Sequence, residues 1–389
     1  MIKIYEKNSY ENHLATKVTA SKKEEGKNLI QLQESIFFPE EGGQYADSGI
    51  IIYGNKELKL LDGQIKKGEI WYSVEEEIPE GSDVICRLDW PIRYSRMQQH
   101  SGEHILTGVI HNRYGYDNIG FHLSDDSAVT LVMNGDLTRD EVLDMERVAN
   151  DVIYRNLPIV DSYPSKEELE HINYRSKKEI EGQVRLITVG CGDDVVDICA
   201  CCAPHVAHTG EIGLIKVVSV AAYKGGTQIG ILCGKRALDY IRNEHEMIDK
   251  LARSFSTSID KIPDSVESMR EEIASLRETT FNLIDEKMKR IISELKEGKN
   301  ACLFIDEDAS PAIMKNCYNA MCEKYEGKVA VFAGKDDKGY RYYAGSRSED
   351  SRLTGNILKE KLGAKGGGNE EMVQGRVDAA KSDIEKLFE

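Results

Sequence analysis

The stretch Gln98-Gln99-His100-Ser101-Gly102-Glu103-His104 places two histidines four residues apart. In a helix this spacing brings both imidazoles onto one face, about one turn from each other. A second pair stands far downstream, in the stretch Cys201-Cys202-Ala203-Pro204-His205. The four side chains offer three imidazoles and one thiolate, which is a ligand set typical of zinc. The sequence therefore predicts a metal site built from two distant segments.

Spacing alone leaves the choice of the downstream ligands open. Cys199 and Cys202 stand close to Cys201, and His208 follows His205 by three residues. Each of these side chains could serve as a ligand on spacing grounds. Ligation needs a neutral imidazole and a thiolate, and both forms are available at neutral pH once a metal is present.

Glu103 adds an alternative interpretation. With His100 and His104 it completes the pattern H-x-x-E-H, the inverted zinc-protease motif, in which the glutamate is the general base. That motif takes a downstream glutamate as its third ligand and does not need a Cys-x-x-x-His. Because a thiolate ligand makes zinc a weaker Lewis acid, the pair Cys201 and His205 favours a protein other than a protease.

Length and composition limit the class of protein. The 389 residues are enough for two or three domains with cores of their own. No apolar run reaches the length of a membrane span and residues 1–6 do not resemble a signal peptide, so we expect a cytoplasmic protein with no membrane partner. The nine cysteines are odd in number and irregularly placed, which favours metal or redox roles over a disulfide framework.

The net charge of -16 argues against broad, sequence-blind binding to nucleic acid, because such binding relies on neutralising phosphates. Acidic residues are concentrated between about residues 239 and 297. The average therefore says little about any one surface, and a local basic groove remains compatible with the sequence.

We expect an α+β protein of four domains, the first two of which hold the metal site. Residues 1–90 alternate short apolar runs with turns, which predicts a small β-barrel. Within it, the loop 37–44 contains two glycines that permit a close approach by a ligand. Residues 91–235 form an α/β layered domain, with a helix that carries both histidines, strands near 129–133, 184–189 and 213–218, and the downstream pair in the last loop.

The remaining residues predict a helical segment and a small terminal domain. Residues 236–299 read as two helices in an antiparallel hairpin or coiled coil, whose apolar stripe should pack against another chain or the terminal domain. Residues 300–389 read as a compact α/β unit, with buried strands at 301–305 and 329–333 around a helix. Lys365 and the glycines 366–368 are expected in a loop whose amides face phosphate.

Several stretches together resemble the long form of the alanyl-tRNA editing protein family. The resemblance covers most of the chain and is carried by residues 37–44, 88–90, 97–106, 119–123, 201–213, 224–227 and 233–238. The stretches 366–368 and 374–376 resemble the small nucleic-acid-binding domain that closes alanyl-tRNA synthetase and the DHH-type phosphoesterases. The family implies zinc bound by His100, His104, Cys201 and His205.

The resemblance also implies a function. Alanyl-tRNA synthetase mischarges its tRNA with serine or glycine because a small amino-acid pocket cannot strongly reject near-isosteres. A free-standing editing protein then hydrolyses the wrong ester. The implied activity is zinc-dependent deacylation of Ser-tRNA(Ala), and of Gly-tRNA(Ala), in trans. The second interpretation, a zinc-containing protein that binds tRNA without turnover, stays open, as does the inverted zinc protease.

Roles can be assigned to residues around the zinc ligands. His122 and Glu103 are the candidates for catalysis, His122 as a pocket residue that hydrogen-bonds the substrate or water. The candidates for contact with tRNA are Gln44, Lys224, Lys365, Gly366, Gly367 and Gly368. We further expect a homodimer formed through the helical and glycine-rich C-terminal region.

The sequence departs from the family at the metal loop and beyond it. Cys202-Ala203-Pro204 stands where the family has Gly-Gly-Thr, so a hydroxyl near the metal is lost and the loop is stiffened. Gln228 stands where an arginine is expected, which removes one contact to RNA. These departures bear on substrate preference and activity, and they leave the ligands unchanged.

Overall fold

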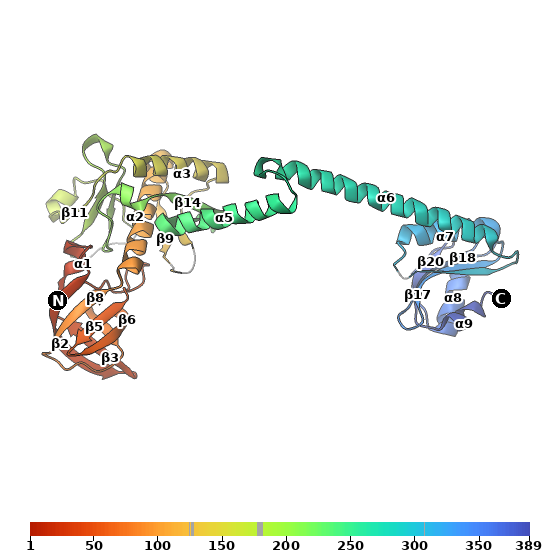
Figure 1. Ribbon diagram of the computed structural model, residues 1–389, viewed down its shortest axis with the longest axis horizontal. Helices are drawn as coiled ribbons and strands as arrows, with labels where there is room; N and C mark the ends of the chain where they lie inside the picture. Colours follow the sequence, from red (N-terminus) through yellow and green to blue (C-terminus); the bar gives the residue numbers. More distant parts are fainter. Residues whose placement is uncertain (124, 126–127, 177–181, 307) are drawn as a thin grey trace. The chain divides into compact units, whose positions relative to one another are not determined.

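The computed structural model describes residues 1–389 except 124, 126–127, 177–181 and 307 (Figure 1). The described chain divides into two compact units, Met1–Ile248 and Asp249–Glu389. All nine cysteines lie among the described residues and none is in a disulfide. Among the described residues, no helix is long and apolar enough to cross a membrane.

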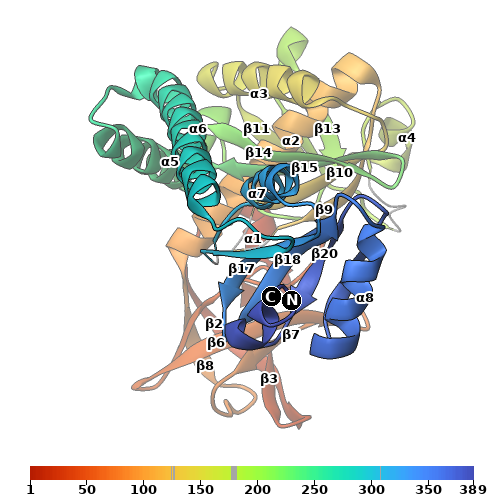
Figure 2. The same ribbon diagram turned by 90° about the vertical axis from the view of Figure 1, so that its right-hand side faces the viewer.

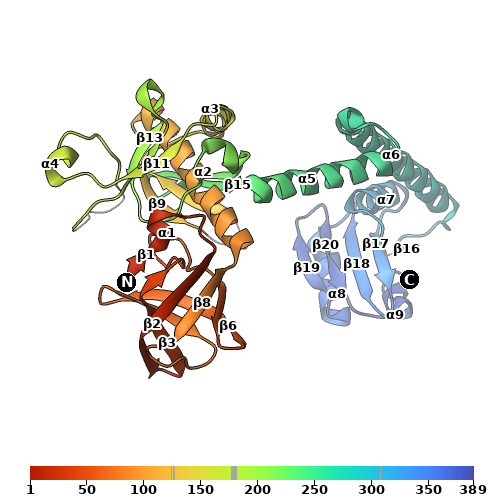
Figure 3. The same ribbon diagram turned by 60° about the vertical axis from the view of Figure 1, so that its left-hand side comes forward.

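The first unit begins with a closed β-barrel, as the sequence predicts (Figure 3). Its apolar core includes Ile30, Ile51 and Tyr72, each fully buried, because alternate residues of each strand face the interior. The short strands β1 (Ile2–Lys3) and β4 (Glu34–Ser35) pair in parallel outside the barrel, next to helix α1 (Ile4–Lys7). The barrel strands in closed order are β2 (His13–Glu24), β3 (Lys27–Leu32), β7 (Glu69–Val74), β6 (Lys56–Lys66), β5 (Gly49–Tyr53) and β8 (Asp83–Leu88).

Helix α2 (Trp90–Tyr114) follows the barrel and is the central element of the first unit. Proline at the first turn and Gly115 in the left-handed conformation (φ 74°) at the C-cap define its ends. Every residue from Arg96 to Ile110 is buried, because the barrel covers one part of the helix and two sheets and another helix cover the rest. A helix buried on all sides cannot rotate or shift without disturbing its neighbours.

Two antiparallel sheets and a second helix pack around α2. The predicted strand at 129–133 is confirmed, and the helix that follows it is capped by Thr138, which forms a capping box with Glu141. The four-stranded sheet is ordered β14 (Ile215–Tyr223), β15 (Gly226–Cys233), β10 (Val129–Met133), β9 (Asn118–His122), and the three-stranded sheet is β11 (Ile159–Ser162), β12 (Leu186–Val189), β13 (Asp197–Ala200). The helices are α3 (Arg139–Tyr154) and α4 (Lys166–Leu169), with 3-10 turns at Gly192–Asp194 and Thr209–Ile212.

The two helices predicted for residues 236–299 are α5 (Gly234–Ser254) and α6 (Ile262–Glu294). The residues between them include a 3-10 turn at Ile259–Lys261, and Pro263 stands in the first turn of α6. The C-terminal part of α6 packs into the core of the terminal domain through Met288 and Ile292. The terminal domain was expected to begin at residue 300. Its compact unit also includes α6, which ends before that residue. The pairing of α5 with α6 as a hairpin stays a prediction.

The C-terminal domain is a five-stranded mixed sheet with helices on both faces (Figure 2). The predicted strands are confirmed as β16 (Ala301–Ile305) and β17 (Lys328–Lys335), a parallel pair joined through α7 (Pro311–Lys324). The sheet continues with β18 (Gly339–Ser346), β20 (Val373–Val377) and the edge strand β19 (Lys365–Gly368), and the other helices are α8 (Ser351–Leu362) and α9 (Lys381–Glu385). The glycine run expected as a loop is this edge strand, because Gly366 and Gly368 pair with β20.

Candidate metal centre

The two predicted pairs meet at one point inside the first unit. His100 and His104 lie on α2, Cys201 directly follows β13, and His205 follows four residues later; one ligand atom from each lies within 4.8 Å of the others. The Cys201 Sγ is 3.5 Å from His100 Nε2 and 3.4 Å from His205 Nε2. Three nitrogens and one sulfur around a common point are the donor set of a tetrahedral zinc site.

Strand β13 explains why Cys201 reaches the histidines. Side chains alternate along a strand, so Asp197, Cys199 and Cys201 point to the same side. Asp197 and Cys199 are buried toward α2, and Cys201 continues that row at the end of the strand. Cys202 therefore points away from the cluster, and it is absent from the group of four that the geometry gathers.

Each imidazole is held at Nδ1, the ring nitrogen turned away from the cluster. His100 Nδ1 is 2.8 Å from Gln44 Oε1, His104 Nδ1 is 3.0 Å from Asp197 Oδ2, and His205 Nδ1 is 3.0 Å from Ser101 Oγ. A histidine that gives Nε2 to a metal carries its proton on Nδ1 and needs an acceptor there. The three partners supply such acceptors. Both the four donors and the residues that surround them therefore fit a bound metal.

The charges inside the cluster favour the thiolate of Cys201 and, without a metal, the protonated form of His104. Burial alone raises the pKa of the Cys201 thiol, but the neighbouring His100 and His205 lower it well below its usual value. Burial alone lowers the pKa of His104, whereas its hydrogen bonds to Asp197 and Cys201 raise it to about 9. The thiolate is the ligating form of cysteine, and a metal displaces the proton from the histidine.

The loop that carries Cys201 and His205 is held from two sides. Arg185 donates to the carbonyl oxygens of Cys201 at 3.3 Å and of Ala203 at 2.8 Å. The Ser101 hydroxyl accepts from the backbone N–H of Val206 at 3.2 Å. Ala203 is buried against the barrel core. These contacts position the loop even though Cys202-Ala203-Pro204 replaces the residues that the family carries there.

The glycine loop of the barrel completes the site. The Gly43 carbonyl accepts from the Leu123 N–H at 3.0 Å, and Gly43 has a positive φ of 84°. A Cβ on Gly43 would lie 2.7 Å from the Phe121 carbonyl oxygen, so only glycine permits this close approach. The buried pair Arg93 and Asp47 links α2 to the end of the same loop. The loop is thus fixed to the strand and helix that surround the metal cluster.

Gln44 lies at the centre of this loop and is fully buried. Its Oε1 contacts His100, and its Nε2 has no hydrogen-bond partner among the residues that the structure describes. The expected contact of Gln44 with the acceptor end of the tRNA stays a prediction, and the burial of the side chain limits that contact to a group that enters the site. Its position suits a contact with a small group bound beside the metal.

The sequence suggests His122 as the pocket residue of this strand, but its neighbour Phe121 lies beside the metal cluster. The Phe121 ring lies on the His100 ring, with 4.7 Å between centroids. His122 is exposed and packs edge-on against Tyr45, with 5.8 Å between centroids. Because successive side chains of β9 point to opposite sides, Phe121 faces the metal cluster and His122 does not. The catalytic role of His122 stays a prediction that these contacts do not support.

Glu103 is buried between the two histidines of α2. Its Oε2 is 3.9 Å from His100 Nε2 and 3.8 Å from His104 Nε2, and its Oε1 accepts a hydrogen bond from Asn118. This position suits a group that exchanges a proton with water near the metal, and the role remains a prediction. The inverted-protease interpretation needs a second glutamate. The donors gathered among the described residues are His100, His104, Cys201 and His205 in one group and His104, Asp197 and Cys199 in another, and neither group contains that glutamate.

Apart from Gln44, the residues expected to contact tRNA occupy exposed positions. Lys224 lies at the tip of the hairpin between β14 and β15, with its amine 5.1 Å from the centre of the Tyr223 ring. In the C-terminal unit, Lys365 and the glycines 366–368 are exposed on the edge strand β19. Their contact with RNA remains a prediction.

Sequence reasoning missed a row of cations beside Lys365. Arg341 on β18 is directly opposite Arg376 on β20, which is directly opposite Lys365 on β19. All three side chains are exposed and on one face of the sheet. Arg376 is paired with Asp378 at 3.1 Å, and Arg341 donates to the Ala309 carbonyl at 2.8 Å. The strand register, which the sequence did not predict, is the signal that reveals this row.

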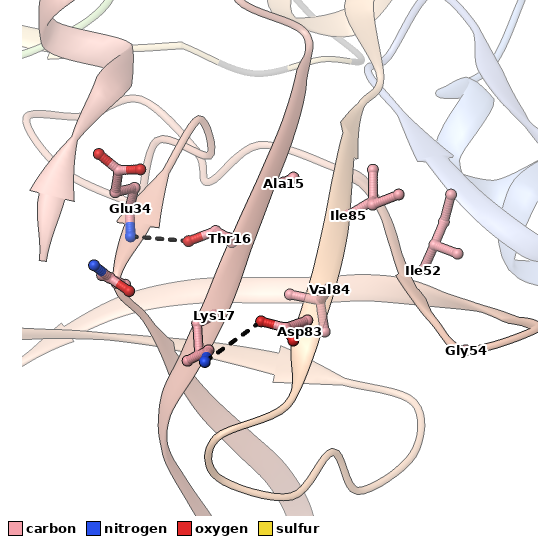
Figure 4. A pocket seen from close by; sticks show the side chains of 10 residues that line it. Ala15, Thr16, Lys17, Glu34, Ile52, Gly54, Asp83, Val84 and Ile85 are labelled. Atoms are coloured by element: carbon pink, nitrogen blue, oxygen red, sulfur yellow. Dashed lines mark hydrogen bonds and ion pairs between the residues drawn. The ribbon is translucent and has the colours of Figure 1, made fainter.

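Two cavities lie in the first unit, and most of the residues that line them are outside the metal cluster. One of about 500 Å³ opens on the outer surface of the barrel, where Lys17 and Asp83 form an ion pair 3.6 Å long and Thr16 accepts from the Glu34 N–H (Figure 4). A second, of about 180 Å³, lies behind the metal loop and touches His205. Neither contains a group of gathered donors, so the metal cluster remains the candidate site.

Comparison with known proteins defines the class first. Residues 184–229, which include Cys201 and His205, match the threonyl and alanyl tRNA synthetase second additional domain. Residues 297–389 match the DHHA1 domain. The chain is thus a relative of the alanyl-tRNA synthetases, with the metal loop in one matched domain and the glycine strand in the other.

Individual relatives are similar to this chain along much of its length. The alanyl-tRNA editing protein AlaX-L of Pyrococcus horikoshii is 28% identical over 98% of this chain and 96% of its own length. The alanine–tRNA ligase of Caldivirga maquilingensis is 28% identical over 90% of this chain, and that of Pyrobaculum aerophilum is 32% identical over 62%. The chain spans 40% and 28% of the lengths of these two ligases. The predicted resemblance to the long form of the alanyl-tRNA editing protein family is confirmed.

Proposed function

We propose that this protein is a cytoplasmic, zinc-dependent hydrolase that deacylates tRNA(Ala) mischarged with serine or glycine. The observation that carries the proposal is the cluster of His100, His104, Cys201 and His205, with all three imidazoles held at Nδ1. The similarity to AlaX-L along nearly the whole chain supports the substrate class. Four protein donors leave a tetrahedral zinc no open position, so zinc bound here would hold and orient the substrate, and it would activate water only where water replaces one of the four.

The residues around the cluster suit a small acyl group. The buried Nε2 of Gln44 has no acceptor among the described residues and can donate to a carbonyl or hydroxyl oxygen of the aminoacyl group. Glu103 can hold a proton during attack by water, because its carboxylate lies within 4 Å of both α2 ligands. The Phe121 ring covers His100 and limits the entry of water to that side.

The C-terminal domain supplies affinity for the RNA. The row of Arg341, Arg376 and Lys365 offers three cations at the spacing of adjacent strands, beside exposed glycines. Phosphates contacted in this way hold a polynucleotide without reading its sequence. A local basic row also explains how a chain with a net charge of -16 can bind tRNA.

The proposal is tested by deacylation of a panel of charged tRNAs. Ser-tRNA(Ala) and Gly-tRNA(Ala) should lose their amino acid in the presence of the protein, and Ala-tRNA(Ala) should not. Removal of zinc by a chelator should stop the reaction, and added zinc should restore it. Binding of Ser-tRNA(Ala) without any turnover would instead support the non-catalytic tRNA-binding interpretation.

A separate assay addresses the protease interpretation. A general peptide substrate should remain uncleaved by the wild-type protein. If the wild type cuts the peptide and Glu103→Gln abolishes that cleavage, the inverted zinc protease replaces the hydrolase proposed above.

A further inference from the structure

Arg175 links the metal cluster to the helix that carries two of its ligands. Its Nε is 2.8 Å from Asp197 Oδ1, and its Nη2 donates to the Thr107 hydroxyl at 2.8 Å. The other carboxylate oxygen of Asp197 is 3.0 Å from His104 Nδ1. The Asp197 and His104 side chains are almost fully buried, and the Arg175 side chain is 11% exposed.

The backbone of Arg175 is held as firmly as its side chain. Its N–H donates to the Ile198 carbonyl at 2.8 Å, and its own carbonyl accepts from the Ala200 N–H at 2.9 Å. Arg175 therefore lies alongside β13 as a parallel bridge to Cys199. Because the backbone and the guanidinium are both fixed against the strand that leads to Cys201, the position of the arginine is defined by the fold.

This arrangement determines how Asp197 can act on His104. A carboxylate can turn about its last side-chain bond, and a turn would move its acceptor away from the imidazole N–H. The guanidinium presents rigid, planar donors, so its hydrogen bond to Oδ1 fixes the plane in which Oδ2 points. The positive charge also offsets the cost of burying the carboxylate.

We propose that Arg175 is a positioning residue of the metal centre, which fixes the His104 imidazole through Asp197 and ties both to α2 through Thr107. The inference rests on the metal-binding part of the proposed function and is independent of the reaction with tRNA. Arg175 holds the His104 side chain in place before a metal binds, so its loss should lower the affinity for the metal.

The test measures zinc affinity of the full-length protein, stripped of metal and titrated against a chromophoric chelator without tRNA. Arg175→Met keeps the length of the side chain and removes the donors; zinc affinity should fall about 10–100-fold, the usual effect of losing a partner of a ligand. Arg175→Gln places an amide nitrogen as many bonds from the backbone as Nε, so it should recover part of that loss. Arg155→Met is the control, because Arg155 pairs with Asp194 at the surface and should leave the affinity unchanged.

A second pair of variants separates positioning from general damage to the fold. In Asp197→Asn the amide nitrogen must face the N–H of either His104 or Arg175, so donor meets donor and affinity falls. Adding Arg175→Gln supplies a carbonyl oxygen that accepts from the new asparagine, so the double variant should bind zinc more tightly than Asp197→Asn alone. The inference is overturned if the zinc affinity of Arg175→Met stays within twofold of the wild-type value. It is also overturned if the losses of zinc affinity from Asp197→Asn and Arg175→Gln simply add in the double variant. Deacylation by the wild type tests the proposed function separately.

Discussion

At the scale of single residues, the sequence predicted the donors of the metal centre more fully than their surroundings. Spacing indicated His100 with His104, whereas Cys201 and His205 were chosen among their neighbours from the family resemblance, and the structure gathers all four. Asp197 was missed because it lies 93 residues from the histidine it contacts. Counting back from Cys201 by twos along β13 would have found it, since strand residues alternate in direction. Gln44 was found as a site residue, but its contact with His100 depends on how the barrel loop folds.

The choice of Cys201 over its neighbours is the first prediction at this scale. Cys201→Ala should hold about 0.1 zinc per chain or less, against about one in wild type, because a tetrahedral site loses its thiolate. Cys202→Ala is the matched control and should keep its zinc, since Cys202 lies outside the group of four. Metal analysis of the two purified variants measures this, and equal zinc in both would refute the assignment.

Gly43 carries a second prediction. Gly43→Ala should lower the free energy of unfolding by about 1–2 kcal/mol for its positive φ and by about 1–3 kcal/mol more for the clash with the Phe121 carbonyl. Gly68 has nearly the same φ, 83°, and nothing within 4 Å of its missing Cβ, so Gly68→Ala isolates the first part. Denaturant unfolding of both variants compares them. Equal destabilisation would mean that the loop adapts, and that its approach to β9 is not tight.

At the scale of helices and strands, the sequence predicted elements with strong local patterns and missed those that depend on pairing. The barrel, α2 and the β16–α7–β17 unit follow from apolar periodicity and turns. Strand β13 is four residues long and β19 consists of Lys365 and three glycines, so neither has a pattern of its own. Pairing with neighbouring strands defines both, and such tertiary pairing overrides the weak propensity of glycine.

The cation row on this sheet gives a prediction for RNA binding. Arg376→Ala and Lys365→Ala should each weaken tRNA binding and reduce the slope of log affinity against log salt by about one. Arg352→Ala is the control, because Arg352 is an exposed arginine of the same domain on α8, paired with Asp350. Filter binding or fluorescence titration at several salt concentrations measures the slopes. An unchanged slope in Arg376→Ala and Lys365→Ala would exclude the row from the interface.

At the scale of the whole molecule, we expect the first compact unit to carry the reaction and the second to bind RNA. Every zinc donor lies in Met1–Ile248, and the cation row lies in Asp249–Glu389. A protein truncated after Ile248 should keep zinc and approach the full-length rate at saturating tRNA, with a raised KM. Steady-state kinetics on Ser-tRNA(Ala) measures this. Loss of turnover at saturation, with zinc still bound, would place part of the active site in the second unit.

Helix α6 underlies a prediction about assembly. Val266, Met269, Ile273 and Leu276 follow each other at spacings of three and four, and each is more than a third exposed. Such a stripe suits a coiled coil with a second copy of the chain, the homodimer expected from the sequence. Sedimentation should give a dimer for wild type and a monomer for Ile273→Glu. A wild-type monomer at micromolar concentration would contradict this expectation.

The central claim is that one bound zinc and the deacylation of mischarged tRNA belong to the same site. The most direct test measures zinc content and the rate of Ser-tRNA(Ala) hydrolysis on the same preparations of wild type, Cys201→Ala and Cys202→Ala. Zinc and hydrolysis should be lost together in Cys201→Ala, and Cys202→Ala should retain its zinc together with measurable hydrolysis. Full hydrolysis by zinc-free Cys201→Ala, or no hydrolysis by zinc-loaded wild type, would contradict the account.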